Sequence, residues 1–231
     1  TFLDYLGAWY APRRIVVGAA GAVNGEFLSE VEAQFGSLED RSTGEPVPVE
    51  VSQDEPRVSL ETRDSDQAHL RLGVRGLPTD HPDRYVMQVL SAILGGGMSS
   101  RLFIEVRERK GLAYYVFCHH SAYEDAGTLF SQAGVDIERI DLAVSTIVGE
   151  FAKLANEPVE DDELRRTKNF LKGRLVLQLE DPRGLLGFGL RREVLEGRLV
   201  EPEEVLERIN QAVAKILHSP RLLVPFGAGV T

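Results

Sequence analysis

The pattern that most restricts the fold is a strict alternation of apolar and polar residues over positions 68–75. The apolar members are Ala68, Leu70, Leu72 and Val74, and between them stand His69, Arg71, Gly73 and Arg75. A period of two predicts a β-strand with one buried and one wetter face, because successive side chains of a strand point to opposite sides of the sheet. Two further β-rich runs, residues 112–122 and 128–136, are separated by Glu124-Asp125-Ala126-Gly127, which predicts a hairpin.

Helices are predicted between and after these strands. Residues 82–94 form an amphipathic pattern that ends at Gly95-Gly96-Gly97. Ser99 or Ser100 can begin the next helix, and Gly111 ends it in the manner of a left-handed cap. Three or four more helices are expected up to residue 217, followed by a strand near Leu222–Phe226.

The first 57 residues have a different organisation. Residues 1–11 have apolar side chains at helical spacing, and Pro12 ends that pattern. Ile15-Val16-Val17 predicts a short buried strand, and Asn24 can cap a second helix that closes at Gly36. Residues 39–57 are polar and interrupted by three prolines, which is typical of a linker.

An internal match relates the two ends of the chain. The ten residues that begin at Pro12 align with the ten that begin at Pro220, and five positions coincide. A duplicated lobe with a period of about 208 residues explains the match, and a chance similarity between two helix-to-strand joints is the alternative. Under the duplication, residues 1–38 are the tail of a first, mostly missing lobe, residues 39–57 are the linker, and residues 58–231 are a complete second lobe.

Composition excludes several classes of partner. The net charge of −10 argues against nucleic acid, whose affinity for proteins comes mainly from cationic contacts to phosphate. No apolar run approaches the roughly 20 residues that a membrane-spanning helix needs.

The lone cysteine, Cys118, lies in a predicted strand, where a thiol is usually a small buried hydrophobe.

The histidines form no metal-binding pattern. They are His69, His81, His119, His120 and His218. None belongs to an H-E-x-x-H or H-x-x-E-H sequence, so no helical face presents two imidazoles to one zinc ion. The adjacent pair, His119 and His120, lies on a predicted strand, so one ring is expected to be packed and the other solvated. No metal ligand is therefore predicted within this chain.

The most informative segment runs from Leu94 to Val116. It contains, in order, Gly-Gly-Gly, Ser-Arg-Leu-Phe, a further Arg and Gly-Leu-Ala-Tyr. This long pattern resembles the second-lobe signature of the inverzincin zinc metallopeptidases, the family of pitrilysin, insulysin and the mitochondrial processing peptidase. The resemblance extends to residues 1–36 and loosely through the C-terminal helices. It implies an α+β fold, in which helices pack on one face of a mostly antiparallel sheet, and the predicted strand and hairpin support that fold independently.

The resemblance also implies site residues. In that family the zinc ligands lie in the first lobe, and the second lobe contributes an Arg and a Tyr, which match Arg107 and Tyr114. A guanidinium and a phenol can both donate to a peptide carbonyl oxygen that gains charge during attack. The alternative is a surface arginine and a packed tyrosine. By strand alternation, Tyr115 is expected to point away from Tyr114.

The loop of Gly95, Gly96, Gly97 and Ser99 is a candidate substrate-binding segment. It resembles, in reduced form, the glycine-rich recognition loop of the processing peptidase's non-catalytic subunit, although the long glycine insertion of that subunit is absent. A plain helix break is the alternative.

The resemblance implies the substrate-clamping lobe of a zinc metallopeptidase that is not active alone. Its expected partners are a peptide substrate and either a first lobe or a catalytic subunit of the same family, in a homo- or hetero-oligomer. The zinc ion is expected in that first lobe or partner. The rival interpretation is a structural member of the family without a hydrolytic role.

Metal analysis of the purified chain is accordingly expected to find no stoichiometric zinc, because no paired-histidine motif is present. Zinc held by His119 or His120 with an open coordination position would contradict this prediction.

Overall fold

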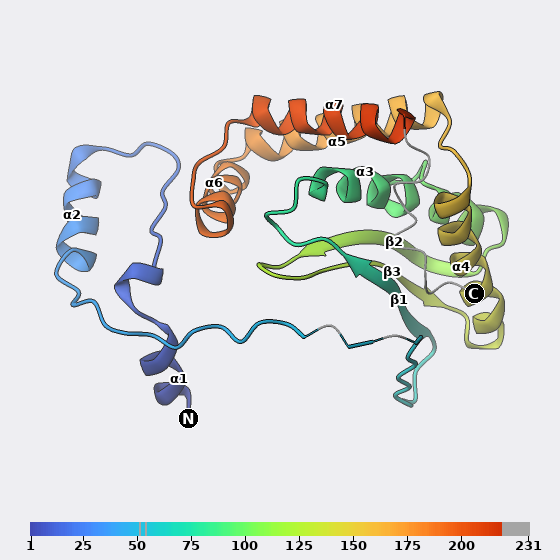
Figure 1. Cartoon of the computed structure of the whole chain (residues 1–231), viewed down its shortest axis with the longest axis horizontal. Helices are drawn as coiled ribbons and strands as arrows, with labels where there is room; N and C mark the ends of the chain where they lie inside the picture. The colour runs from blue at the N-terminus through green and yellow to red at the C-terminus, as the bar shows by residue number, and fades with distance from the viewer. Residues whose placement is uncertain (51, 54, 219–231) are drawn as a thin grey trace. The chain divides into compact units, whose positions relative to one another are not determined.

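A computed structural model describes residues 1–50, 52–53 and 55–218 (Figure 1). The chain divides into two compact units. Unit 1 comprises Thr1–Val49 and Leu175–Glu201, and unit 2 comprises Glu50–Arg174 and the chain from Pro202 onward. The predicted strand near Leu222–Phe226, and with it the second half of the internal match, lies outside the described residues.

The described elements of unit 2 include three strands, whereas those of unit 1 are all helical. In unit 2 they are β1 (Ala68–Gly76), α3 (Arg84–Gly95), η2 (Phe103–Arg109), β2 (Ala113–Ala122), β3 (Gly127–Val135), η3 (Ile137–Arg139), α4 (Ile140–Asn156) and α7 (Pro202–His218). In unit 1 they are α1 (Phe2–Trp9), η1 (Pro12–Arg14), α2 (Gly25–Phe35) and α6 (Pro182–Glu196). Helix α5 (Asp161–Glu180) crosses the division between the units. None of the helices in this described part is long and apolar enough to cross a membrane.

The sheet of unit 2 has the order β1-β3-β2, and both pairings are antiparallel. Strand β3 is therefore central, with Ser131 opposite Leu72 of β1 and Cys118 of β2. The turn between β2 and β3 is closed by a hydrogen bond of 2.8 Å from the Tyr123 amide to the Ala126 carbonyl. The predicted strand and hairpin are both confirmed.

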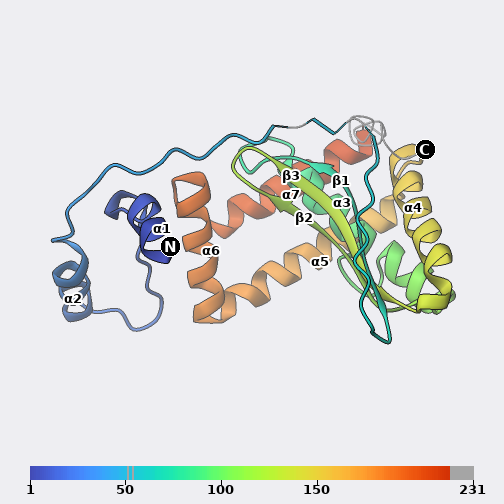
Figure 2. The ribbon, with the colours of Figure 1, turned by 90° about the horizontal axis from the view of Figure 1, so that it is seen from below.

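The two faces of this sheet differ in what covers them. On one face the side chains of β2 and β3 are buried, as the alternation requires, and α3 packs against β2 (Figures 1 and 2). No helix of the described part of unit 2 lies on the other face, which carries exposed residues such as Arg71 and Phe117. The predicted fold class, α+β with helices on one face of an antiparallel sheet, is confirmed.

Helix α3 is buried almost all round rather than along one stripe. Every residue of α3 except Arg84 and Gln88 is buried. The cause is its position between the sheet and α7, both of which it contacts. A helix that is apolar on every side is stable only where other elements surround it.

The C-terminal end of α3 lies unusually close to β2. A Cβ atom on Gly95 would lie 2.7 Å from the Cys118 Cβ and would overlap the Cys118 backbone nitrogen. Gly96 follows as the C-cap, and its amide donates to the Ala92 carbonyl at 3.0 Å. Packing of α3 on the sheet therefore accounts for at least the first glycine of the run.

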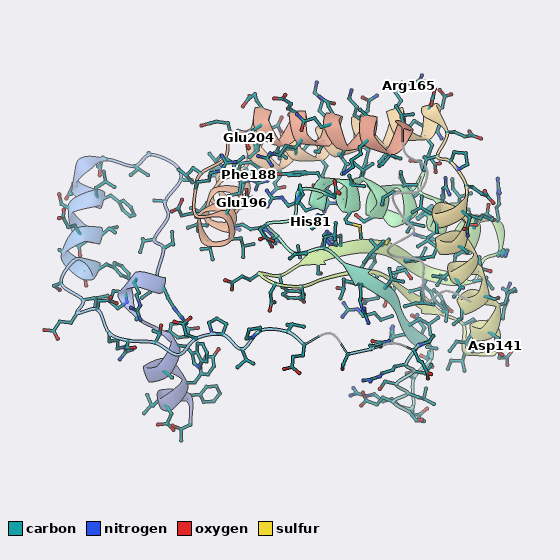
Figure 3. All side chains as sticks on the ribbon, in the orientation of Figure 1. His81, Asp141, Arg165, Phe188, Glu196 and Glu204 are labelled. Atoms are coloured by element: carbon teal, nitrogen blue, oxygen red, sulfur yellow. The ribbon has the colours of Figure 1, made fainter. Side chains whose placement is uncertain are left out.

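Unit 1 contains the predicted N-terminal helices. Thr1 and Asp4 form a capping box at the start of α1, and the Asn24 side chain accepts from the Phe27 amide at the start of α2, as predicted. Phe188 of α6, labelled in Figure 3, is buried. The Arg192 guanidinium stacks over its ring, 3.7 Å from the centroid.

The predicted strand at Ile15-Val16-Val17 is wrong. These residues form no strand and are 40–46% exposed. A strand needs a neighbour to pair its backbone groups, and the described part of unit 1 contains none. Instead the chain packs Gly18 on α6, where an added Cβ would lie 2.7–2.9 Å from side-chain atoms of Leu186 and Leu190.

The close approach of α3 to β2 generates a stability prediction. Gly95→Ala should lower the free energy of unfolding by about 1–3 kcal/mol, since the new methyl group has no room. Gly149→Ala is the matched control: it lies inside α4 with nothing within 4 Å of an added Cβ, and it should gain about 0.5–1 kcal/mol from helix propensity. Urea denaturation measures both, and equal effects would contradict the packing argument.

Candidate functional site

Arg107 lies on a helical turn of unusual winding. The predicted helix after the glycine run is present, but residues Phe103–Arg109 are wound as a π-helix. Such turns are rare and frequently occur at functional sites. The Arg107 guanidinium stacks over the Phe103 ring at 4.9 Å and is exposed to solvent. It forms no ion pair or hydrogen bond within the described part of the chain.

A tight turn joins this helix to β2. Gly111 has a φ of +57°, so the predicted left-handed cap is confirmed. The Leu112 amide donates to the Val106 carbonyl at 2.8 Å. From outside the turn, the Arg139 guanidinium donates to the carbonyls of Lys110 and Gly111 at 2.8 and 3.2 Å. These contacts satisfy the carbonyl groups of the turn and hold its conformation.

Tyr114 occupies a β-bulge at the start of β2. Ala113 lies opposite Val135 and Tyr115 lies opposite Gly134, so Tyr114 is an extra residue without a partner on β3. Its side chain is 62% exposed and forms no hydrogen bond with any described residue. Bulges re-aim side chains and are over-represented beside active sites. The bulge interrupts the alternation of β2, so the relative direction of Tyr114 and Tyr115 does not follow from a period of two.

Tyr115, in contrast, is engaged on the open face of the sheet. Its ring stacks with the rings of His69 and Phe117, with centroids 6.3 and 6.0 Å away. Its hydroxyl lies 3.1 Å from Nδ1 of His69 and accepts from the Gln132 amide at 3.5 Å. The two neighbouring tyrosines therefore differ: Tyr115 is tied to other side chains, and the phenol of Tyr114 is available.

One residue of the signature has a role that the sequence analysis did not identify. Arg101 donates to both carboxylate oxygens of Glu163 on α5, at 2.9 and 2.7 Å. Both side chains are largely buried, at 16% and 17% exposure, and the hydrogen bonds to Glu163 raise the pKa of Arg101. Arg101 stands at the start of the helix that runs over residues 101–109, hereafter the signature helix, so the pair ties that start to α5. Nothing in the sequence indicates Glu163, because it lies 62 positions further along the chain.

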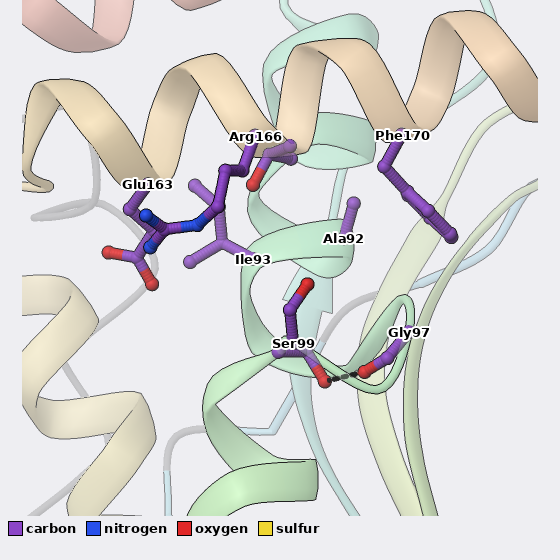
Figure 4. A pocket seen from close by; sticks show the side chains of 9 residues that line it. Ala92, Ile93, Gly97, Ser99, Glu163, Arg166 and Phe170 are labelled. Carbon is purple, nitrogen blue, oxygen red and sulfur yellow. Dashed lines mark hydrogen bonds between the residues drawn. The ribbon is translucent and has the colours of Figure 1, made fainter.

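The glycine loop borders a pocket in unit 2 (Figure 4). Of the four loop residues predicted to contact substrate, Gly97 and Ser99 line this pocket, and Gly95 and Gly96 are not among its lining residues. The buried Ser100 hydroxyl donates to the Gly97 carbonyl at 2.6 Å and holds the loop in shape.

The histidine pair divides as expected, with one ring packed and one solvated. His119 is exposed on the open face, whereas His120 is half-buried beside the backbone of Leu77, with Nε2 3.1–3.2 Å from its nitrogen and oxygen. Burial lowers the pKa of His120. Burial also raises the pKa of the neighbouring Cys118 thiol to about 12, which leaves it protonated and unreactive, as expected for a buried cysteine.

Side chains that could ligate a metal do not cluster among the described residues. Nowhere among them do three or more His, Cys, Asp or Glu residues gather in a group that could hold a metal ion. The described residues therefore do not fit a resident zinc ion, which needs three or four such ligands.

Comparison with known proteins gives consistent matches. The family model of the peptidase M16 inactive domain matches residues 1–171. An uncharacterized zinc protease of Bacillus subtilis, YmxG, is 35% identical over 207 residues, which cover 90% of this chain and 50% of YmxG. An uncharacterized zinc protease of Mycobacterium tuberculosis, Rv2782c, is 36% identical over 234 residues, which cover 96% of this chain and 52% of that protein. The chain thus spans about half the length of the curated relatives that it matches.

Solved structures share the fold. A protease from Helicobacter pylori superposes with a TM-score of 0.74 at 22% identity, over 87% of this chain and 50% of that chain. A peptidase M16 inactive domain from Pseudomonas fluorescens gives 0.65 at 22% identity, over 87% and 48%. A chain of complex III2 from Candida albicans gives 0.69 at 18% identity, over 86% and 49%.

Half-buried His120 makes stability depend on pH. Its pKa is lowered in the folded state, so the unfolded state binds the proton first as the pH falls below about 6.5. The free energy of unfolding should therefore decrease from that pH downward until the folded pKa is reached. His120→Gln should flatten this decrease, measured by urea denaturation between roughly pH 7 and pH 5. His69→Gln, on the open face, is the matched control, and an equal flattening there would contradict the assignment.

Proposed function

This chain belongs to the peptidase M16 family, whose inactive domain it contains, and we propose that it acts as the substrate-clamping lobe of a zinc peptidase. The family match confirms the resemblance that the signature segment indicated. The proposed reaction of the whole assembly is hydrolysis of a peptide bond. The zinc ion, and the water that it activates, would belong to a first lobe or a partner subunit, because the described residues of this chain do not fit a metal.

The observation that carries the proposal is the pair of unused donors at either end of one tight turn. Arg107 and Tyr114 are both exposed, and neither donates to another described residue. The turn between them is held by Gly111 and Arg139. A fixed backbone with two free donors suits a site that must present hydrogen bonds to a ligand without first breaking its own.

The two donors are assigned different roles. The phenol of Tyr114 donates to the carbonyl oxygen of the cleaved peptide bond as that oxygen gains negative charge. The Arg107 guanidinium, which offers several N–H donors, also holds the carbonyl before attack. Neither role requires a metal ligand from this chain.

The glycine loop supplies the proposed second contact with the peptide. Gly97 and Ser99 line the pocket of unit 2 and are its best candidates for substrate contact. The space at Gly95 is already taken by the packing of α3 on β2. For Gly95 and Gly96 we therefore assign an indirect part, in which the absence of a side chain lets the last turn of α3 pack closely against Cys118 and Ala92 and so positions the start of the loop.

Two origins of the chain are compatible with the proposed role. It is either the second half of an active peptidase or a non-catalytic subunit that lends Arg107 and Tyr114 to a catalytic partner. Both place the catalytic metal elsewhere. In a purely structural member of the family, the unused donors would have no function, so substitution of either would leave any assembly's activity unchanged.

The proposal predicts separate kinetic effects in the intact, zinc-bearing assembly. Tyr114→Phe should lower kcat about 10²–10³-fold with little change in substrate affinity, because its hydrogen bond strengthens only beyond the ground state. Arg107→Ala should lower kcat and also raise KM, since it removes a contact to the bound substrate. Steady-state kinetics with a fluorogenic peptide measure both.

Tyr115→Phe is the matched control for Tyr114→Phe. It removes one hydroxyl from the next residue, which is bonded within the open face of the sheet, and should leave kcat within about threefold of the parent. Equal, mild effects of the two substitutions would remove the catalytic role of Tyr114 and favour the structural interpretation.

A further inference from the structure

The pocket beside the glycine loop offers a second site, separate in its residues from Arg107 and Tyr114. Helix α5 forms one wall, and the end of α3 with the 97–100 loop forms the other (Figure 4). The pocket is a small, partly open cleft with an enclosed volume of about 20 Å³, roughly the room that one water molecule needs. The lining residues are Ala92, Ile93, Gly97, Ser99, Ser100, Glu163, Arg166, Thr167 and Phe170. All of them belong to unit 2.

Three donors of this pocket are unused. Thr167 is only 8% exposed, yet its hydroxyl has no hydrogen-bond partner among the described residues. The hydroxyl oxygen itself is within reach of solvent, so it is open to a ligand as well. Ser99 lines the opposite wall and is likewise without a described partner. Arg166 is exposed and forms no ion pair within the part of the chain that the structure describes.

The charges in the pocket leave one cation unbalanced. Glu163 is the acidic residue of the lining, and both of its carboxylate oxygens accept from Arg101. That pair is neutral as a unit, so the guanidinium of Arg166 remains without a counter-charge.

An apolar wall accompanies the donors. Phe170 faces Gly97 across the pocket, and a Cβ on Gly97 would lie 3.2 Å from the Phe170 ring. The absence of a side chain at position 97 therefore keeps the space in front of the ring open. Ala92 and Ile93 of α3 complete this wall. A few convergent polar groups beside apolar walls are typical of a small ligand site.

We propose that this pocket binds a carboxylate of the peptide substrate, with Arg166 as the charged donor and the hydroxyls of Ser99 and Thr167 as its neighbours. The proposal rests on the proposed function, since that function makes the ligand a peptide. A guanidinium pairs with a carboxylate through two parallel hydrogen bonds. The single positive charge of Arg166 can balance one carboxylate of a ligand. A ligand group with two negative charges would be repelled by the nearby Glu163 carboxylate. The carboxylate comes either from an Asp or Glu side chain or from the C-terminus of the peptide.

The test is binding of capped tripeptides to the purified, isotope-labelled chain, followed by amide chemical shifts. The probes are acetyl-Ala-Ala-Glu-amide, acetyl-Ala-Ala-Ala with a free C-terminus, and the neutral acetyl-Ala-Ala-Gln-amide. At least one acidic probe is expected to shift the amides of Ser99 and Thr167 in a saturable manner and to bind at least tenfold more tightly than the neutral probe. The first probe reports a side-chain carboxylate and the second a terminal one.

Arg166→Gln should weaken binding of the acidic probe at least tenfold and abolish its preference over the neutral probe. The matched control is Arg165→Gln, which removes the same charge from the adjacent position. Arg165 points outward from α5 (Figure 3), pairs with Asp162 and does not line the pocket, so binding should be unchanged. Thr167→Val, which keeps the shape and removes the hydroxyl, should weaken binding severalfold.

Several results would overturn the proposal: equal binding of the acidic and neutral probes, an equal loss in Arg165→Gln and Arg166→Gln, or no binding of any probe at millimolar concentration. Tyr114→Phe should leave tripeptide binding unchanged. If the kinetic predictions for Tyr114 and Arg107 fail while the acidic probes still bind preferentially, the proposed function has failed and the carboxylate site has not. If those kinetic predictions hold and the acidic probes show no preference, the carboxylate site alone has failed.

Discussion

The burial of α3 against the sheet is the constraint on which the rest of unit 2 depends. The helix has almost no exposed surface, because β2 lies on one side of it and α7 on another. Gly95 allows its last turn to lie directly on Cys118. Burial of this many apolar side chains supplies the main driving force for the unit. It also determines where the chain leaves the core, and hence where the loop and the signature helix begin.

The signature helix connects the core to both candidate sites. At its beginning, Arg101 and Glu163 join it to α5, which forms a wall of the pocket for which carboxylate binding is proposed. At its end, the π-turn presents Arg107, and the Gly111 turn leads into the bulge at Tyr114. One short helix, anchored at both ends, therefore separates the proposed carboxylate site from the proposed carbonyl donors. An extended peptide that engages both would be held at two points on a rigid support, which favours a defined orientation.

The donors and the structural contacts of this region use different residues. Arg101, Arg139 and Ser100 are engaged with other protein groups and hold the loop and the turn in place. Arg107, Tyr114 and Arg166 are exposed and lack such partners among the described residues. This division is what a preorganised site requires, because the groups that hold its shape are not those that must be free to bind. The described part of this chain thus contains no metal-binding cluster, yet it has donors without partners among the described residues.

The sequence by itself determined the features that depend on local chemistry. Alternation at 68–75 predicted β1, Asn24 predicted the cap of α2, and Gly111 predicted a left-handed turn, because each depends on residues within a few positions of one another. The signature also indicated the family and directed attention to Arg107 and Tyr114. Tertiary structure alone decided the features that need distant partners: the pairing of Arg101 with Glu163, the bulge that singles out Tyr114, and the pocket between the loop and α5. It also overruled the predicted strand at residues 15–17, since an apolar β-branched run becomes a strand only where a neighbouring strand can pair with its backbone.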